Sequence, residues 1–133
     1  MDARTAARIA VVQALYEQEV NACKFDHDEK AHELAKANEF KRINKKLFSV
    51  IFTKAAEDIA NIDEKIKQNL SETWSFERIG GVLRGILRAA IAEGEMPEAK
   101  HKLIISEYVS IAGMFFDDKE TGFVNGILGK ILK

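Results

Sequence analysis

Side chains that commonly do chemistry are few in this chain, and their spacing does not suit catalysis. His27 and His32 stand five residues apart, whereas two histidines that bind zinc from one helix are four apart. Cys23, His27 and Asp28 carry atoms that bind metals, but a solvated loop is the simpler interpretation of this segment. Cys23 also lacks the third, orienting residue of a cysteine–histidine catalytic pair. We therefore predict no metal site and no catalytic site.

The carboxylates and glycines form no catalytic or phosphate-binding pattern either. Glu57-Asp58 and Asp117-Asp118 are expected to be surface and capping charges of helices rather than an acid–base pair. The three glycines within residues 80–85 lie among apolar residues at helical spacing, where small side chains permit close contact between helices. The sequence predicts neither an enzymatic activity nor a cofactor.

Basic residues form the most informative polar pattern. Arg4 and Arg8 are four residues apart, which places them on one face of an expected first helix. They lie at its N-terminal end, where the helix dipole disfavours positive charge, so an anionic ligand is one explanation for them. Ordinary solubilising charge is the other. A second basic cluster, either a solvated helix face or an extension of an RNA-binding surface, comprises Lys41, Arg42, Lys45 and Lys46.

Length and composition limit the class of protein. The 133 residues are expected to form one domain, residues 1–133. A net charge of −1 gives no overall attraction to nucleic acid, so RNA binding would have to come from a local patch. The single cysteine cannot form an internal disulfide, which fits a reducing compartment. No apolar run approaches the ~20 residues of a membrane span and no signal peptide is recognisable, so we expect a cytoplasmic protein without membrane association.

The elements that would position these residues are helices. One proline and eight glycines indicate few breaks, and apolar residues recur at helical spacing along most of the chain. Ser71 or Ser75 is expected to open the helix that ends near Gly94, and Thr121 to cap the last helix. The last helix is rich in glycine, asparagine and apolar residues, which predicts close packing. We predict seven helices, over residues 3–21, 28–36, 38–60, 63–70, 75–94, 100–116 and 122–132.

Residues 103–111 allow a second interpretation. Leu103-Ile104-Ile105 and Val109 include the β-branched residues that are typical of a strand. A single strand without a partner would leave its backbone hydrogen bonds unmade, so a helix is the better prediction. The expected architecture is an all-α bundle around one core.

Four short motifs resemble, in order and spacing, those of the NusB family of bacterial transcription antitermination factors. Each motif alone is typical of many helices, but together they cover nearly the whole chain. The first runs from Ala3 to Tyr16, and the second comprises Trp74, Glu77-Arg78-Ile79, Ile86-Leu87-Arg88 and Glu93. The third is Ile105-Ser106-Glu107, and the fourth is Phe123-Val124-Asn125-Gly126-Ile127-Leu128 with Lys130.

The resemblance implies a fold and a function. The fold would be an all-α bundle of about seven helices in two packed sub-bundles. The protein would be a non-enzymatic antitermination factor that binds boxA-type single-stranded RNA together with a NusE-type small-subunit ribosomal protein. The pair would join the RNA polymerase elongation complex and support processive transcription of ribosomal RNA operons.

The resemblance also implies RNA-binding residues. The arginine-rich start of the family's first helix would contact RNA phosphates, which carries over to Arg4 and Arg8. Gln13, Lys102 and Phe123 match positions expected on the same RNA-binding face. A core position is the alternative interpretation of Phe123.

A second surface is expected to bind the partner protein. Tyr16, Arg78 and Val82 are the residues assigned to it, although Tyr16 is also consistent with an ordinary half-buried aromatic residue. Arg88 and Glu93 are expected to be structural and to form bonds between helices.

The chain departs from the family pattern at several charged positions. Thr5 and Ala6 stand where arginine is frequent, and Gly122 replaces a lysine that is common before the phenylalanine. Leu83-Arg84 stands where an acidic and then a basic residue are frequent, so the charge of the partner surface is expected to differ. Fewer phosphate contacts predict weak RNA binding by the protein alone and dependence on its partner.

Two alternative functions remain open. One is a helical protein–protein adaptor with little RNA binding. The other is the RNA-binding module of a NusB-like ribosomal RNA methyltransferase, which would require a large α/β domain that these 133 residues do not contain.

Overall fold

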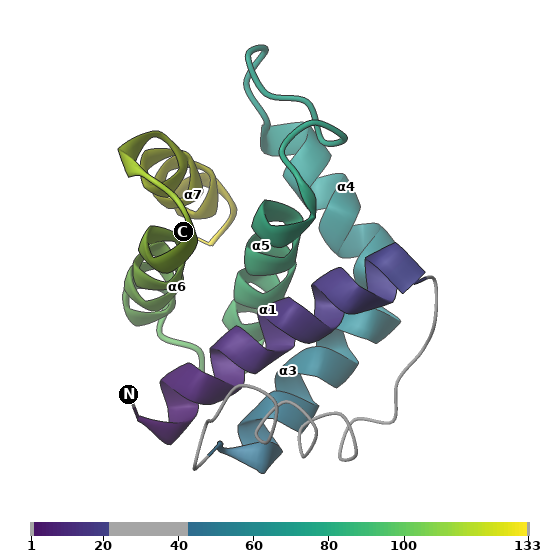
Figure 1. The fold of residues 1–133 in the computed structure, drawn as a ribbon, viewed down its shortest axis with the longest axis vertical. Helices are drawn as coiled ribbons and strands as arrows, with labels where there is room; N and C mark the ends of the chain where they lie inside the picture. The colour runs from purple at the N-terminus through teal and green to yellow at the C-terminus, as the bar shows by residue number, and fades with distance from the viewer. Residues whose placement is uncertain (1, 22–42, 133) are drawn as a thin grey trace.

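The computed structural model describes residues 2–21 and 43–132 (Figure 1). Every regular element within these residues is a helix, which confirms the predicted all-α class and the helix over residues 103–111. None of the described helices is long and apolar enough to cross a membrane. The helix predicted over residues 28–36 lies outside the described residues. The described helices are α1 (Ala3–Asn21), α3 (Lys45–Glu57), α4 (Ile59–Asn69), α5 (Gly81–Gly94), α6 (His101–Phe115) and α7 (Asp118–Ile131).

Helix α5 is the centre of the molecule and packs against each of the other described helices. It is buried around nearly its whole circumference, because its residues from Gly85 to Gly94 are apolar or small apart from Arg88 and Glu93. Helices α1 and α3 pack together and cross α5, whereas α6 and α7 form a second pair on another side of it (Figure 1). The start of α1, the start of α3 and the start of α6 are thereby brought to one end of the molecule.

Side chains fix where several helices begin. The carboxylate of Asp2 accepts a hydrogen bond from the backbone N–H of Thr5 (2.8 Å) at the start of α1. The side-chain oxygen of Asn44 caps α3 in the same way. Asp117 precedes α7, so Thr121 lies inside that helix and the prediction that it caps the helix was wrong. The acidic residues Asp117 and Asp118 stabilise the positive end of the α7 dipole.

Two predicted helix boundaries were also wrong. The break between α3 and α4 falls at Asp58, whose backbone N–H still donates to Lys54, rather than near residue 61. Helix α5 begins at Gly81 and not at Ser71 or Ser75. The preceding Gly80 has a φ of 92°, a left-handed conformation that other residues rarely adopt, and it ends the turns of residues 71–79. Because apolar residues recur at helical spacing on both sides of Gly80, the sequence predicted a helix that continued across this break.

Glycines have two different roles. Gly85 permits α5 to approach α1 closely, since a methyl group on it would lie 3.0 Å from the carbonyl oxygen of Val12, and this confirms the predicted packing role. The prediction was wrong for α7. Its glycines Gly122, Gly126 and Gly129 are exposed, and a methyl group on any of them would have no neighbour within 4 Å.

Candidate nucleic-acid interface

The two arginines of α1 have different environments. Arg4 is exposed, whereas Arg8 is only 4% exposed, because the surface of α1 around Arg8 faces α5 and α6. A signal for this was present in the sequence: Arg8 precedes Val12 and Leu15 at helical spacing on the buried face of the helix. Spacing of four residues placed the arginines near each other but did not reveal which of them faced solvent.

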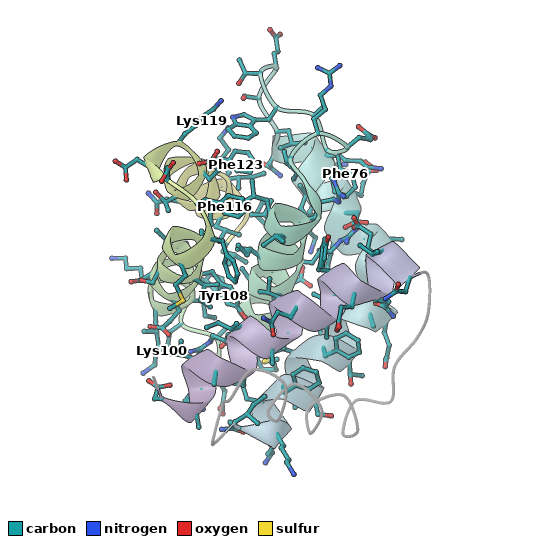
Figure 2. The ribbon with its side chains drawn as sticks, viewed as in Figure 1. Phe76, Lys100, Tyr108, Phe116, Lys119 and Phe123 are labelled. Atoms are coloured by element: carbon teal, nitrogen blue, oxygen red, sulfur yellow. The ribbon has the colours of Figure 1, made fainter. Side chains whose placement is uncertain are left out.

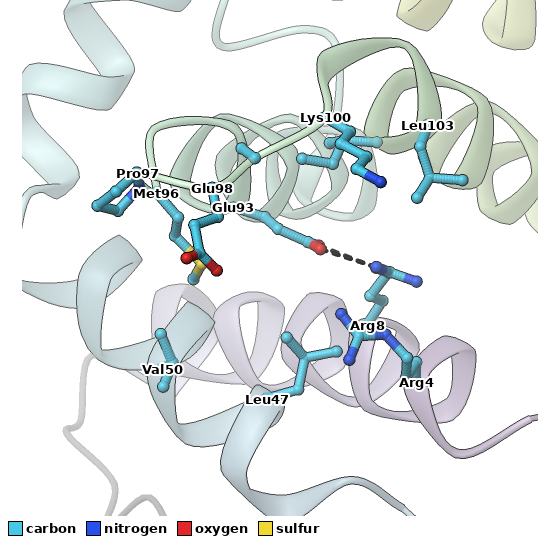
Figure 3. A pocket seen from close by; sticks show the side chains of 12 residues that line it. Arg4, Arg8, Leu47, Val50, Glu93, Met96, Pro97, Glu98, Lys100 and Leu103 are labelled. Carbon is cyan, nitrogen blue, oxygen red and sulfur yellow. Dashed lines mark hydrogen bonds and ion pairs between the residues drawn. The ribbon is translucent and has the colours of Figure 1, made fainter.

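The guanidinium of Arg8 is bound by two carboxylates (Figure 3). Its Nε and Nη2 donate to the two carboxylate oxygens of Glu93 at 2.9 and 2.8 Å, and Nη1 donates to Glu107 at 3.1 Å. These bonds, the one to Glu93 above all, raise the pKa of Arg8, although burial acts in the opposite direction. The geometry argues against the predicted phosphate contact by Arg8, because each of its donor nitrogens is already engaged with a carboxylate.

Tyr108 completes this buried cluster. Its hydroxyl donates to Glu93 at 2.9 Å, and burial raises the pKa of the tyrosine well above its usual value. Thr5 donates to Glu107 at 3.3 Å from the other side. The cluster therefore fixes α1 to α5 and α6, and it confirms the predicted structural role of Glu93.

A groove lies beside this cluster, between the starts of α1 and α3 and the connection from α5 to α6 (Figure 3). Its volume is about 630 Å³. Two exposed cations, Arg4 and Lys100, lie toward one end near the Arg8–Glu93 pair, and Glu98 lies toward the other. The remaining lining is mainly apolar and comprises Leu47, Val50, Met96, Pro97, Ala99, Leu103 and Ile104.

A second, more open groove of about 530 Å³ runs between α6 and α7. Lys102, which the sequence assigned to the RNA face, is exposed at this groove. Ser106 and Ser110 follow it along the same face of α6, and Asn125 of α7 completes the polar lining. These side chains supply one positive charge and several hydrogen-bonding groups that suit a phosphate–sugar backbone.

Phe123 is half-buried and does not stand alone. Its ring stacks on Trp74, with 4.2 Å between ring centroids and 25° between planes. The Lys119 ammonium lies 5.4 Å from the centroid of the Trp74 ring, which adds a cation to the aromatic pair. Figure 2 places Phe123 and Lys119 far along the molecule from Lys100, so one nucleotide cannot reach both places. Sequence reasoning missed Lys100 and Lys119, which the fold rather than any motif brings to the surface.

Gln13 and the second basic cluster complete the predicted RNA residues. Gln13 is half-buried in the middle of α1. Lys45 and Lys46 are exposed in the first turn of α3, whose start adjoins α1 through a hydrogen bond from Asn44 N–H to the Ala3 carbonyl (3.0 Å). Residues 41 and 42 lie outside the described part of the chain.

The residues predicted to bind the partner protein lie around the start of α5. Tyr16 is 40% exposed, and one edge of its ring lies against Gly81, where a methyl group would be 2.6 Å from Cδ1 and 2.7 Å from Cε1 of the ring. Val82 is half-buried beside this contact, and Arg78 is exposed in the preceding turns. Leu83, whose position had suggested altered surface charge, is buried in the core.

An ion-pair network supports that surface. Glu19 accepts hydrogen bonds from Arg84 and from Arg88, the latter at 2.5 Å. Arg88 also forms a two-fold ion pair with Asp63 at 2.7 and 2.8 Å, which confirms its predicted role between helices. Arg84 donates to the carbonyl oxygen of Phe76 (2.9 Å) and thereby holds the turns before α5. The hydrogen bond from Arg84, with the help of Arg88, lowers the pKa of Glu19.

The described residues show no grouping of three or more histidine, cysteine, aspartate or glutamate side chains able to hold a metal ion. The metal-ligand candidates considered from the sequence, Cys23, His27, Asp28 and His32, fall in the part of the chain that is not described.

The sequence profile of the NusB family matches residues 5–133. The chain belongs to the NusB family. Among curated relatives, the transcription antitermination protein NusB of Caulobacter vibrioides is 33% identical over 146 residues, covering 98% of this chain and 92% of that protein. The protein of the same name from Sphingopyxis alaskensis is 34% identical over 140 residues, with coverage of 98% and 92%.

Solved structures of the NusB family have the same fold. T. maritima NusB superposes with a TM-score of 0.80 at 26% identity, covering 99% of this chain and 92% of that one. A chain in the crystal structure of the antitermination factors NusB and NusE in complex with double-stranded RNA gives a TM-score of 0.76 at 26% identity, with coverage of 96% and 94%. The family resemblance drawn from the four sequence motifs is thus confirmed.

Proposed function

We propose that this protein is a transcription antitermination factor that binds boxA-type RNA together with a NusE-type small-subunit ribosomal protein. The pair acts on the RNA polymerase elongation complex and supports processive transcription of ribosomal RNA operons. The observation that carries this proposal is the match to NusB antitermination proteins along almost the whole chain, supported by the similar chain in a NusB–NusE–RNA complex.

The RNA-binding surface we propose follows the exposed cations. Arg4 contacts phosphate at the start of α1, and Lys102 contacts the backbone along the groove between α6 and α7. Phe123, together with Trp74, offers a stacked aromatic pair to a base, and Gln13 reaches a base or sugar from α1. Arg8 supports this surface by fixing α1 and is not itself a phosphate ligand.

The partner-binding surface we propose consists of Tyr16, Arg78 and Val82 around the start of α5. Its support is the exposure of Tyr16 and Arg78 and the close contact of the Tyr16 ring with Gly81. A flat aromatic ring held against the backbone loses little conformational freedom on binding, which suits it to a protein interface.

At the level of the whole chain, we propose one domain over residues 1–133, with about seven helices in two packed sub-bundles. The packing of α1 with α3 and of α6 with α7, on different sides of α5, supports the two sub-bundles. A cytoplasmic location follows from the proposed role in transcription.

A pull-down of the full chain with a NusE-type ribosomal protein, with and without boxA-type RNA, tests the function. We expect a binary complex that takes up the RNA more tightly than either protein alone. Failure of the two proteins to associate at micromolar concentration, in the presence and absence of RNA, would refute the proposal.

A protein–protein adaptor with little RNA binding is the second candidate, and the burial of Arg8 favours it because one expected cation is lost from the surface. Arg4→Gln separates the two functions. The variant weakens RNA binding by the protein–partner pair if the antitermination proposal is correct, and leaves it unchanged if the chain is only an adaptor.

A further inference from the structure

The groove beside Arg8 combines two features that the proposed RNA contacts do not use together. Arg4 and Lys100 supply positive charge at one end, and beside them lies a lining that is mainly apolar. Two of the apolar side chains are large and exposed, Leu103 at 52% and Val50 at 45%. Exposed apolar side chains that line one groove, together with the other apolar residues of its lining, are typical of a binding surface.

Positive and negative side chains lie at opposite ends of the groove. Arg8 is paired with Glu93 at the inner wall and with Glu107, which does not line the groove, so the other charged side chains of the lining are Arg4, Lys100 and Glu98. The first two lie near one end and the carboxylate toward the other (Figure 3). An anionic group is therefore attracted to the Arg4–Lys100 end and repelled from the Glu98 end.

The backbone adds to the positive character of the first end. Helix α6 begins directly after Lys100, no side chain caps its first turn, and that turn contains no acidic residue. The positive end of the helix dipole favours an anion at this position, in addition to the two side chains.

We propose that this groove holds one unstacked nucleotide of the bound RNA, with its phosphate at Arg4 and Lys100 and its base along the apolar lining that extends from Leu103 at that end to Val50 and Met96 at the other. The inference rests on the proposed function, and the groove is continuous with the proposed RNA surface because Arg4 belongs to both. A nucleotide matches the groove because it is anionic at one end and flat and largely apolar at the other. Contacts of this type recognise an extruded base with little sequence preference.

Leu103→Gln tests the base contact, and Met114→Gln is its matched control. Both residues are exposed and lie on α6, at 52% and 54%, but Met114 does not line the groove. The measurement is the affinity of the full chain, with its NusE-type partner, for boxA-type single-stranded RNA. We expect Leu103→Gln to weaken binding by roughly three- to tenfold and Met114→Gln to leave it unchanged.

A series of RNAs with a single abasic position then identifies the nucleotide. With the unmodified protein, removing the base at one position of the RNA should weaken binding by a similar factor. With the Leu103→Gln variant, removing the same base should cause no further loss of affinity. Val50→Thr, which keeps the side-chain shape but adds a hydroxyl, provides a second variant if Leu103→Gln disturbs folding. Additive losses at every abasic position would contradict the proposal, as would equal affinities of the Leu103 and Met114 variants.

Two other outcomes are distinguishable from these. If Leu103→Gln releases the ribosomal protein in a pull-down without RNA, the groove belongs to a protein interface and the nucleotide proposal is overturned. If the unmodified pair fails to bind boxA-type RNA, the proposed function itself fails and the groove assignment falls with it.

Discussion

At the scale of single residues, the structure separates two arginines that the sequence treated as one motif. Family resemblance and spacing assigned both arginines at the start of α1 to RNA, but they did not distinguish a surface cation from a buried one. The difference arises because Glu93 and Glu107 come from helices about 85 to 100 positions later in the chain. The spacing of Arg8 from Val12 and Leu15 indicates that it lies on the buried face of α1, but the identity of its carboxylate partners depends on the packed fold.

The two arginines should consequently respond differently to substitution. Arg8→Gln leaves Glu93 buried without its ion-pair partner and should lower the free energy of unfolding by about 3–5 kcal/mol. Arg4→Gln should change that free energy by less than about 0.5 kcal/mol, because Arg4 is exposed. Urea denaturation followed by circular dichroism measures both. Equal stabilities of the two variants would contradict the structural role assigned to Arg8.

The network around Glu19 predicts a dependence of stability on pH. Its pKa is lowered in the folded protein, so its stabilising contribution is complete above the unfolded-state pKa of about 4.3 and is lost as the pH falls through the folded-state value below it. Glu19→Gln should lower the free energy of unfolding at pH 7 by about 1–3 kcal/mol. The unfolding free energy of the variant should also fall less steeply below pH ~4.3, which denaturation curves at pH 3, 4 and 7 would reveal.

At the scale of helices, the sequence predicted their existence better than their ends. Apolar periodicity identified α1, α3, α5, α6 and α7 because each buries one stripe or more against the core. The predicted helix boundaries were wrong where a single residue determines the position at which a helix begins. The left-handed Gly80 ends the turns before α5, and Asp117, rather than Thr121, is the residue that immediately precedes α7. Neither choice changes the apolar pattern from which the helices were inferred.

Alanine substitutions of glycines in α5 and α7 test how closely each helix is packed at those positions. Gly126→Ala adds a methyl group to an open surface of α7 and removes a helix-disfavouring glycine, so it should stabilise the protein by about 0.5–1 kcal/mol. Gly85→Ala places a methyl group 3.0 Å from the Val12 carbonyl oxygen and should destabilise the protein by about 1–3 kcal/mol. Thermal unfolding of both variants measures the two effects. A gain in stability from Gly85→Ala would mean that α1 and α5 can separate without cost.

At the scale of the whole molecule, the sequence predicted the class of fold and the family, whereas the RNA-binding surface proposed above required the structure. The all-α class followed from the helical spacing of the apolar residues. Arg4 and Lys100 come together at one groove because the start of α1 lies beside the connection from α5 to α6, and Lys102 lines a second groove between α6 and α7; no segment encodes these placements by itself. With a net charge of −1, the chain has no general attraction for RNA and must rely on these few local cations.

Adding one cation to this surface should therefore have a measurable effect. Gly122 is exposed, has no neighbour within 4 Å of an added methyl group, and directly precedes Phe123, so Gly122→Lys can be accommodated without repacking. We expect the substitution to tighten RNA binding by the protein–partner pair and to steepen the slope of log affinity against log salt by about 0.7, the value for one phosphate contact on single-stranded RNA. Gly129→Lys places the same charge farther along the open face of α7 and controls for the change in net charge. Identical slopes for the two lysine variants would show that only overall charge matters, whereas a steeper slope for Gly122→Lys alone would place an RNA phosphate beside Phe123.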